Sequence, residues 1–218
     1  MSEINLSGMN NMQYDVLREI GNIGAGNATT ALSQMINSKI DMKVPKVELL
    51  EFKEVSEVVG GAENIVVGIL FTLGGDIDGM MMFMMEQSPS RHLVNLLIRD
   101  IQEYEGKIDE KAENETDYKD FTEIELSALN EIGNIIAGAY LSSLSSLTNL
   151  TITTSIPYMA IDMAGAILSV PAIEFGKIGD NALLIETEFG NFDRALNGYF
   201  LLIPTLESYT AILTSLGL

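Results

Sequence analysis

The sequence predicts an α+β protein built from two related halves, and three observations support this. Of its 218 residues, 47% are hydrophobic, which is enough to bury a core at this length. Residues 15–27 align with residues 127–139 at an offset of 112, and eight of these 13 positions are identical. Helix and strand patterns then follow each copy in the same order, so each half can cover a sheet with helices.

The elements of the first half follow from its hydrophobic pattern and its turn residues. In order, we expect a long helix (about 10–37), a strand (42–52), a short helix (53–60), two apolar strands (64–74 and 77–86) and a helix (88–100). The residues Gly74-Gly75-Asp76 supply the turn between the two apolar strands, and the methionine-rich second strand is apolar enough to be buried on both faces. The last helix begins at Ser88, a capping serine that a proline follows.

The second half repeats this order. We expect a helix (about 121–148), a strand (151–161), a helix (163–177), strands near 181–189 and 197–203, and a last helix (205–217). A turn at residues 190–193, which contain Gly, Asn and Asp, joins the paired strands.

An acidic segment separates the halves. Residues 100–125 carry 11 acidic residues against three lysines, a net charge of −8, so this segment should stay solvated. We therefore expect one domain over 1–218, made of repeats at about 10–100 and 121–218 that an acidic connector at 101–120 joins.

Composition excludes several classes of protein and site. With 12 basic and 31 acidic residues, a formal net charge of −19, the surface should repel phosphate backbones, and we expect no nucleic-acid partner. The absence of cysteine excludes disulfides and thiolate metal sites and is typical of the reducing cytoplasm. The lone His92 lies in a predicted first helical turn, so we assign it no catalytic or metal role. No leader pattern begins the sequence and no apolar run reaches roughly 18 residues, so we expect a cytoplasmic protein without a membrane partner.

The long helix of each half carries a narrow polar stripe. At 100° per residue, Asp15, Glu19, Asn22 and Gly26 fall on one side of the first helix. We expect the opposite and adjoining arc to face the sheet: Leu17, Ile20, Ile23, Ala28 and Ala31. The second helix repeats the stripe at the same angles with Ser127, Glu131, Asn134 and Gly138.

The residue types of the stripe indicate recognition of an outside target. Glu19 and Asn22 are three apart, so both side chains can reach one partner, and the carboxylate can anchor a cation. A neutral amide donates and accepts hydrogen bonds at once, which suits it to orienting a water molecule. Alternatively, these are ordinary surface residues and the glycines serve close helix packing. The repetition at unchanged spacing favours function, and so do the glycines, because each costs up to about 1 kcal/mol in a helix interior.

These residues resemble a known signature. Asp15-x3-Glu19-x2-Asn22-x22-Pro45 recurs as Ser127-x3-Glu131-x2-Asn134-x22-Pro157. Both copies match the Asp/Ser-x3-Glu-x2-Asn-x22-Pro pattern of the CheC, CheX and FliY family of chemotaxis phosphatases. The resemblance covers essentially the whole chain, and the presence of two motifs without a further domain makes it most similar to the CheC type.

The resemblance implies a pseudo-twofold fold with a continuous β-sheet and two long active-site helices on its surface. It also implies hydrolysis of the aspartyl phosphate of the response regulator CheY. Glu19 and Glu131 would pair with the regulator's conserved lysine, while Asn22 and Asn134 would align the attacking water. Asp15, Pro45, Ser127 and Pro157 would support the motif. The Mg²⁺ would belong to the regulator, so this chain would supply no metal ligand.

A second partner is implied as well, the receptor deamidase CheD. Asp162 matches a CheC-like segment expected to contact CheD, and it could equally serve as the N-cap of the helix predicted at 163–177. The alternative function is a non-catalytic adaptor, or a module like that of the flagellar switch, that sequesters phosphorylated CheY or regulates CheD. Two fused copies can complete one sheet within a chain, so we expect a monomer.

Overall fold

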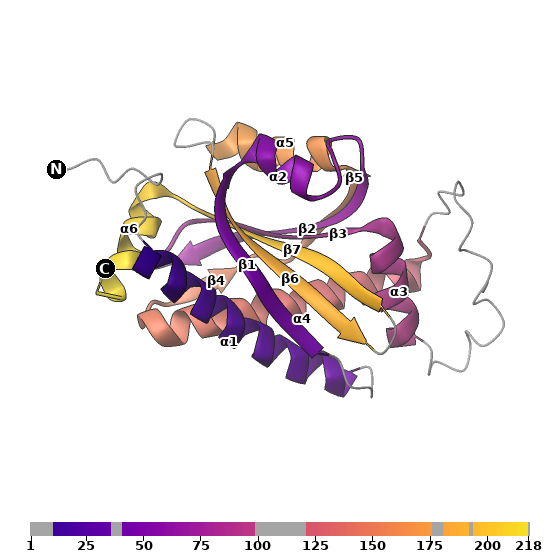
Figure 1. The fold of residues 1–218 in the computed structure, drawn as a ribbon, viewed down its shortest axis with the longest axis horizontal. Coiled ribbons are helices and arrows are strands. Elements are labelled where there is room, and N and C mark those ends of the chain that lie inside the picture. Colours follow the sequence, from indigo (N-terminus) through magenta and orange to yellow (C-terminus); the bar gives the residue numbers. More distant parts are fainter. Residues whose placement is uncertain (1–10, 36–40, 99–120, 176–180, 192–193, 218) are drawn as a thin grey trace.

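The α+β fold class is confirmed in a computed structural model, which describes residues 11–35, 41–98, 121–175, 181–191 and 194–217. One antiparallel sheet is covered by helices on both faces (Figure 1). The expected boundaries of most elements lie within three residues of those observed. The acidic connector predicted at 101–120 lies outside the described residues, so its conformation stays a prediction.

Seven strands form the sheet in the order β1-β6-β7-β3-β2-β4, and β5 also pairs with β2. The strands are β1 (Asp41–Glu51), β2 (Ile65–Gly75), β3 (Gly79–Glu86), β4 (Ile152–Thr154), β5 (Tyr158–Met163), β6 (Asn181–Asn191) and β7 (Arg194–Pro204). At the centre, β3 pairs with β7, and Phe83 lies opposite Phe200. These two strands are the inner strands of two hairpins, β2–β3 and β6–β7. The hairpins are the apolar strand pairs that the sequence predicts.

The outer strands cross between the halves. β1, from the first half of the chain, pairs with β6 of the second, and β4 and β5 of the second half pair with β2 of the first. Each hairpin is therefore completed by a strand from the other half. Neither half forms its part of the sheet alone, a feature that the hydrophobic pattern does not reveal.

The single strand predicted at 151–161 is wrong, because this segment forms two strands with Pro157 between them. Proline has no N–H to donate to a ladder, and here the backbone N–H of Ser155 donates to the carbonyl of Thr72 at 2.9 Å before pairing stops. In β1 the register with β6 shifts between Lys43 and Lys46, the segment that contains Pro45. Both motif prolines therefore lie at an interruption of an outer strand.

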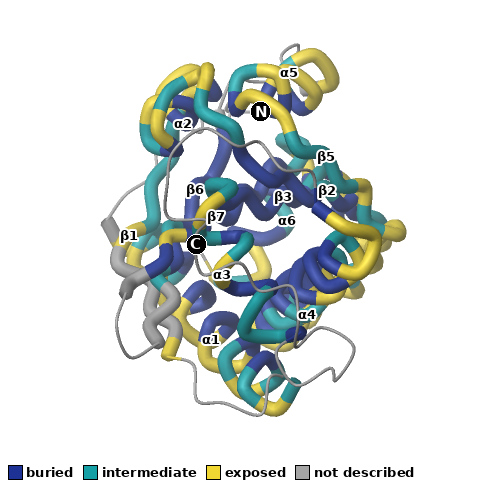
Figure 2. The backbone as a smooth tube through the Cα atoms, turned by 90° about the vertical axis from the view of Figure 1, so that its right-hand side faces the viewer, coloured by how far each residue is buried: buried dark blue, intermediate teal, exposed yellow. Residues whose placement is uncertain are grey.

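In the described part of the chain, two groups of helices cover the two faces of the sheet (Figures 1 and 2). The first group comprises α1 (Asn11–Met35), α3 (Gln87–Ile98), α4 (Glu123–Thr148) and α6 (Leu206–Ser215), and the second comprises α2 (Phe52–Val58) and α5 (Ala164–Phe175). Each face has its own cluster of buried apolar side chains. The central strand β3 serves both, since Met81 and Phe83 pack with the first cluster and Met82 and Met84 with the second, as the apolar run predicts.

The two long helices α1 and α4 lie side by side on the same face (Figure 1). A Cβ at Gly24 of α1 would lie 2.8 Å from Cδ1 and 3.0 Å from the Cα of Tyr140 on α4, so only glycine permits this approach. The ring of Tyr140 stacks on Phe200 with centroids 4.4 Å apart, and its hydroxyl lies 3.1 Å from Oγ1 of Thr187. Burial raises the pKa of Tyr140 to about 12. Tyr140 thus joins α1, α4 and the sheet.

Replacing Gly24 by alanine should destabilise the fold, whereas the same change at Gly26 should not. The new methyl group at position 24 would press on Tyr140, and overpacking costs about 1–3 kcal/mol. At Gly26, among the described residues, nothing beyond the helix's own backbone lies within 4 Å of a Cβ, so Gly26→Ala should gain up to about 1 kcal/mol of helix propensity. Urea unfolding followed by circular dichroism measures both. A Gly24→Ala variant as stable as Gly26→Ala would show that the helices are not in close contact.

Candidate active site

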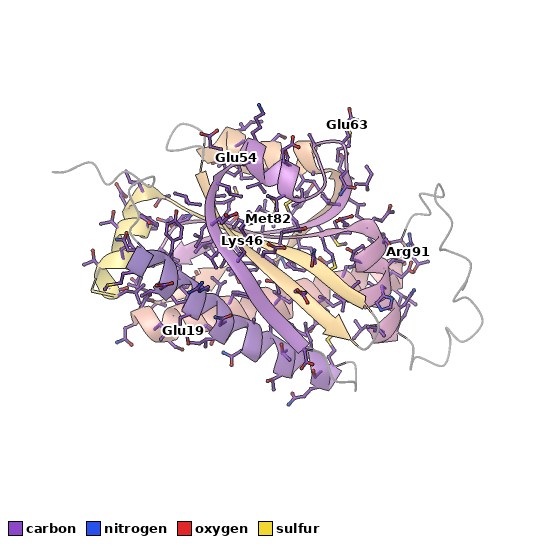
Figure 3. All side chains as sticks on the ribbon, in the orientation of Figure 1. Glu19, Lys46, Glu54, Glu63, Met82 and Arg91 are labelled. Atoms are coloured by element: carbon purple, nitrogen blue, oxygen red, sulfur yellow. The ribbon has the colours of Figure 1, made fainter. Side chains whose placement is uncertain are left out.

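The polar stripe of α1 is exposed along its length. Asp15, Glu19, Asn22 and Gly26 are all exposed, and Leu17 and Ile20 on the opposite side are 3% and 5% exposed. Figure 3 shows Glu19 on this helix. The amphipathic pattern therefore places the stripe correctly.

One residue of the predicted inward arc is misplaced. Ile23 is 38% exposed and does not belong to the buried core. At 100° per residue it lies roughly 80° from Asp15, at the margin of the stripe and well away from the middle of the buried arc. The apolar nature of the residue suggested burial, but its angular position decides the outcome.

The stripe of α4 repeats this exposure. Ser127, Glu131, Asn134 and Gly138 are exposed, while the neighbouring residue Ile132 is 1% exposed. Glu131 and Asn134 thus stand on α4 as Glu19 and Asn22 stand on α1, with the amide three positions after the acid in each pair.

The start of α4 is anchored by interactions that sequence reasoning did not find. The Thr122 side chain accepts a hydrogen bond from the backbone N–H of Glu125, whose carboxylate accepts one from the backbone N–H of Thr122 at 2.7 Å. Glu125 is buried and lies 3.6 Å from Arg91 of α3, whose guanidinium also lies over the ring of Phe121. Figure 3 labels Arg91 on α3. The Thr-x-x-Glu spacing is a capping-box signature, so the cap could be detected from the sequence. The ion pair of Glu125 with Arg91 could not, because Arg91 lies on another helix.

Close packing explains some of the glycines of the two long helices and leaves two unexplained. Gly24 meets Tyr140, and a Cβ at Gly133 would come within 2.6 Å of Ile69. Around Gly26 and Gly138, in contrast, the described part of the chain leaves open space for 4 Å beyond the helix backbone. Close helix packing therefore does not account for the two stripe glycines, and they leave bare helix surface beside each Glu and Asn.

The two stripes differ in charge. On α1 a guanidinium nitrogen of Arg18 lies 2.7 Å from Oδ1 of Asp15, and both side chains are more than half exposed. The corresponding positions on α4 hold Asn130 and Ser127, which carry no charge. An exposed pair of this kind contributes at most about 1 kcal/mol, so its effect concerns the electrostatics of the surface more than stability. The aligned repeats already contain this difference, since Asp15 aligns with Ser127 and Arg18 with Asn130.

The two apolar cavities found among the described residues contain no stripe residue. They are about 20 Å³ each and lie under α1, where Leu17, Leu183 and Leu202 line both. Small-molecule sites are usually concave and larger. Exposed carboxylate and amide groups on a convex helix instead suit contact with another macromolecule. Within the described residues, no group of three or more His, Asp or Glu side chains could hold a metal ion.

The motif prolines and Asp162 are not part of the two long helices. Pro45 belongs to β1 and Pro157 lies between β4 and β5, in the segments that follow each long helix. Asp162 is exposed on β5, and its Oδ1 accepts a hydrogen bond from the backbone N–H of Met163 at 2.7 Å.

The capping role considered for Asp162 is not observed. The first amides of α5, those of Ala164 and Gly165, donate to the carbonyls of Asn64 and Ala62 at 2.8 and 2.9 Å. The backbone of the loop between α2 and β2 therefore caps α5, and the Asp162 carboxylate remains at the surface.

Comparisons with known proteins match both stripes. The model of the CheC-like family matches residues 12–49 and 124–157, which contain both Glu/Asn pairs and both prolines. The CheY-P phosphatase CheC of Bacillus subtilis is 35% identical over 217 residues, which cover 97% of each chain. The crystal structure of Thermotoga maritima FliY superposes with a TM-score of 0.72 at 21% identity, covering 96% of this chain and 98% of that one, and shows a shared fold. No helix in the described ranges has the length and apolar character needed to cross a membrane.

Alanine in place of any one residue of the two Glu/Asn pairs should leave the stability of the fold nearly unchanged. Glu19, Asn22, Glu131 and Asn134 are exposed, so each substitution should alter the free energy of unfolding by less than about 0.5 kcal/mol. Glu125→Ala, on the same helix as Glu131, is the matched control. It removes a buried carboxylate that closes the cap of α4 and should cost about 1–2 kcal/mol. Thermal unfolding of all five variants tests this, and a large loss at Glu131 would mean that its side chain supports the fold.

Proposed function

The chain belongs to the CheC-like family, and on this basis we propose that it is a phosphatase that hydrolyses the aspartyl phosphate of the response regulator CheY. The relative from Bacillus subtilis is named as a CheY-P phosphatase and matches along nearly its whole length. The observation that carries the proposal is the repeated, exposed Glu/Asn pair beside a bare glycine on α1 and on α4.

In this mechanism the two side chains of a pair have different tasks. Glu19, or Glu131 in the second site, binds the ammonium group of the regulator's conserved lysine and fixes the orientation of the two proteins. Asn22, or Asn134, enters the regulator's acidic pocket, accepts a hydrogen bond from a water molecule and holds that water in line with the phosphorus. Gly26 and Gly138 let the backbone of the regulator approach the helix closely.

The reaction places few demands on this chain. The water oxygen bonds to phosphorus while the bond from phosphorus to the aspartyl oxygen breaks, which yields inorganic phosphate and a free aspartate. The Mg²⁺ of the regulator supplies positive charge for the phosphoryl oxygens, so the phosphatase needs no metal ligand of its own. An acyl phosphate already hydrolyses unaided, and each ~1.4 kcal/mol removed from the barrier gives a factor of ten. Positioning one water can supply several such factors.

We further propose that Asp162 helps to bind CheD. The support is its exposure on the outer strand β5 together with apolar side chains in the same region, where Tyr158 is 70% exposed and Ile173 of α5 is 77% exposed. Protein interfaces combine an apolar core with a polar rim, and exposed apolar side chains together with an exposed carboxylate can supply both. This surface belongs to β5 and α5, whereas both stripes lie on helices that cover the opposite face of the sheet, so both partners can bind at once.

We also propose that the chain is a monomer that acts in the cytoplasm. The crossed outer strands complete the sheet within one chain, so a second copy is not needed to supply a missing strand.

Substituting both amides should abolish most of the phosphatase activity. Asn22→Ala and Asn134→Ala should each retain the activity of the other site, while the double variant should lose about 100-fold, the usual effect of removing a positioned transition-state contact. Phosphate release from phosphorylated CheY, with the phosphatase substoichiometric, measures this. Gln34→Ala, an exposed amide on α1 outside the stripe, is the control and should behave as the natural chain.

The same assay separates the proposed enzyme from a sequestering adaptor. A catalyst accelerates phosphate loss at substoichiometric amounts, whereas an adaptor slows it or leaves it unchanged. If the folded double variant kept full activity, the assigned mechanism would be wrong.

Charge reversal at Asp162 should weaken the complex with CheD. Asp162→Lys replaces an exposed carboxylate, so the fold should be kept while co-elution with CheD on a sizing column is lost. Glu207→Lys on α6 makes the same charge change at another exposed position and should leave the complex intact. Co-elution of the Asp162→Lys variant at the natural affinity would remove this residue from the interface.

A further inference from the structure

Three large apolar side chains stand exposed beside the polar stripes. Within the described residues nine large hydrophobic side chains are more than a third exposed, and three of them lie on the stripe side of α1 or α4. These are Met12 (64%), Ile23 (38%) and Ile124 (42%). Met12 and Ile124 occupy the same position of the repeat, since they are separated by the offset of 112 residues.

Their angular positions place them along one margin of each stripe. Measured from Asp15, Glu19 lies at roughly 40°, Met12 at roughly 60° and Ile23 at roughly 80°, on the basis of 100° per residue. Met12 is thus two turns before Glu19, and Ile23 is one turn after it. On α4, Ile124 and Ile135 stand in the same relation to Glu131, although Ile135 is half-buried and packs partly against the core.

Folding does not account for these exposed positions. Met12, Ile23 and Ile124 belong to neither buried cluster and are not packed against one. Isolated exposed hydrophobic residues are common on protein surfaces and need no explanation. Here, however, the exposure recurs at one repeat position, on the margin of each stripe and two turns before its glutamate.

We propose that Met12 and Ile124, together with Ile23, form an apolar rim through which each stripe docks the phosphorylated response regulator. This inference rests on the proposed function and adds the residues that determine affinity. The rim lies on the same side of each helix as its Glu/Asn pair, and apolar side chains beside a few polar contacts are typical of protein interfaces. Glu19 and Glu131 fix the orientation, and the rim supplies area that is removed from water on binding.

Charge favours this occupant over a second copy of the chain. Pairing the stripes of two copies would bring carboxylates together on a chain with a formal net charge of −19, which is repulsive. In the proposed function the regulator instead presents a lysine to the same surface, so its charge complements that of the stripe.

A neutral polar substitution tests the rim without changing the charge near the acids. The double variant Met12→Gln/Ile124→Gln should raise KM for phosphorylated CheY about tenfold and leave kcat within about twofold, because binding is weakened and the water-positioning amides are intact. The affinity for CheY activated with beryllofluoride should fall by a similar factor. Thermal unfolding should match that of the natural chain.

Two controls isolate the effect. Leu147→Gln alters a side chain on α4 that is 45% exposed, close to the value of Ile124, but lies near the other end of the helix, and it should leave KM unchanged. Met12→Leu/Ile124→Leu keeps the apolar rim and should retain the natural KM. If the natural chain is active and the double glutamine variant has the natural KM and affinity, the proposal of an apolar rim is wrong and the proposed function stands. A natural chain that does not accelerate phosphate release overturns the proposed function, and the rim with it.

Discussion

The exchange of outer strands between the two halves is the constraint on which the rest of the structure depends. β1 completes the hairpin β6–β7, and β4 and β5 complete β2–β3, while β3 and β7 close the centre. Because each exchanged segment directly follows a long helix in the chain, the exchange also brings α1 and α4 onto the same face. The position of both polar stripes on one side of the molecule is therefore a consequence of how the strands pair.

The contact between the long helices makes that arrangement specific. Gly24 allows α1 to approach Tyr140, whose ring rests on Phe200 and whose hydroxyl meets Thr187 in the sheet. In addition, the Asn27 amide donates to Oγ of Ser143 at 3.1 Å across the same interface. With their inner sides committed to packing, the helices leave the opposite sides free for recognition. Rigid secondary structure under a site helps to hold its side chains in a productive geometry.

Much of this was predictable from the sequence, for identifiable reasons. Helical periodicity with turn residues located nearly all the elements, and the 100° rule predicted the exposure of Glu19, Asn22, Glu131 and Asn134. The failures have local causes, since Pro157 divides a strand that propensity alone would continue, and Ile23 is apolar but lies at the wrong angle for burial. Strand exchange, the ion pair of Arg91 with Glu125 and the contact of Gly24 with Tyr140 join residues far apart in the chain, so single-sequence patterns carry no signal for them.

The unequal sizes of Gly24 and Tyr140 determine how the two halves of the chain can pair. In the repeat, Gly24 corresponds to Ile136 and Ala28 to Tyr140, so α1 is small and α4 is large at their crossing. Two copies of α1 packed together would leave a void there, and two copies of α4 would be overfilled, both of which are costly. The halves are thus complementary components that assemble one to one. If they were produced as separate polypeptides, the packing would favour the mixed pair over either pair of identical halves.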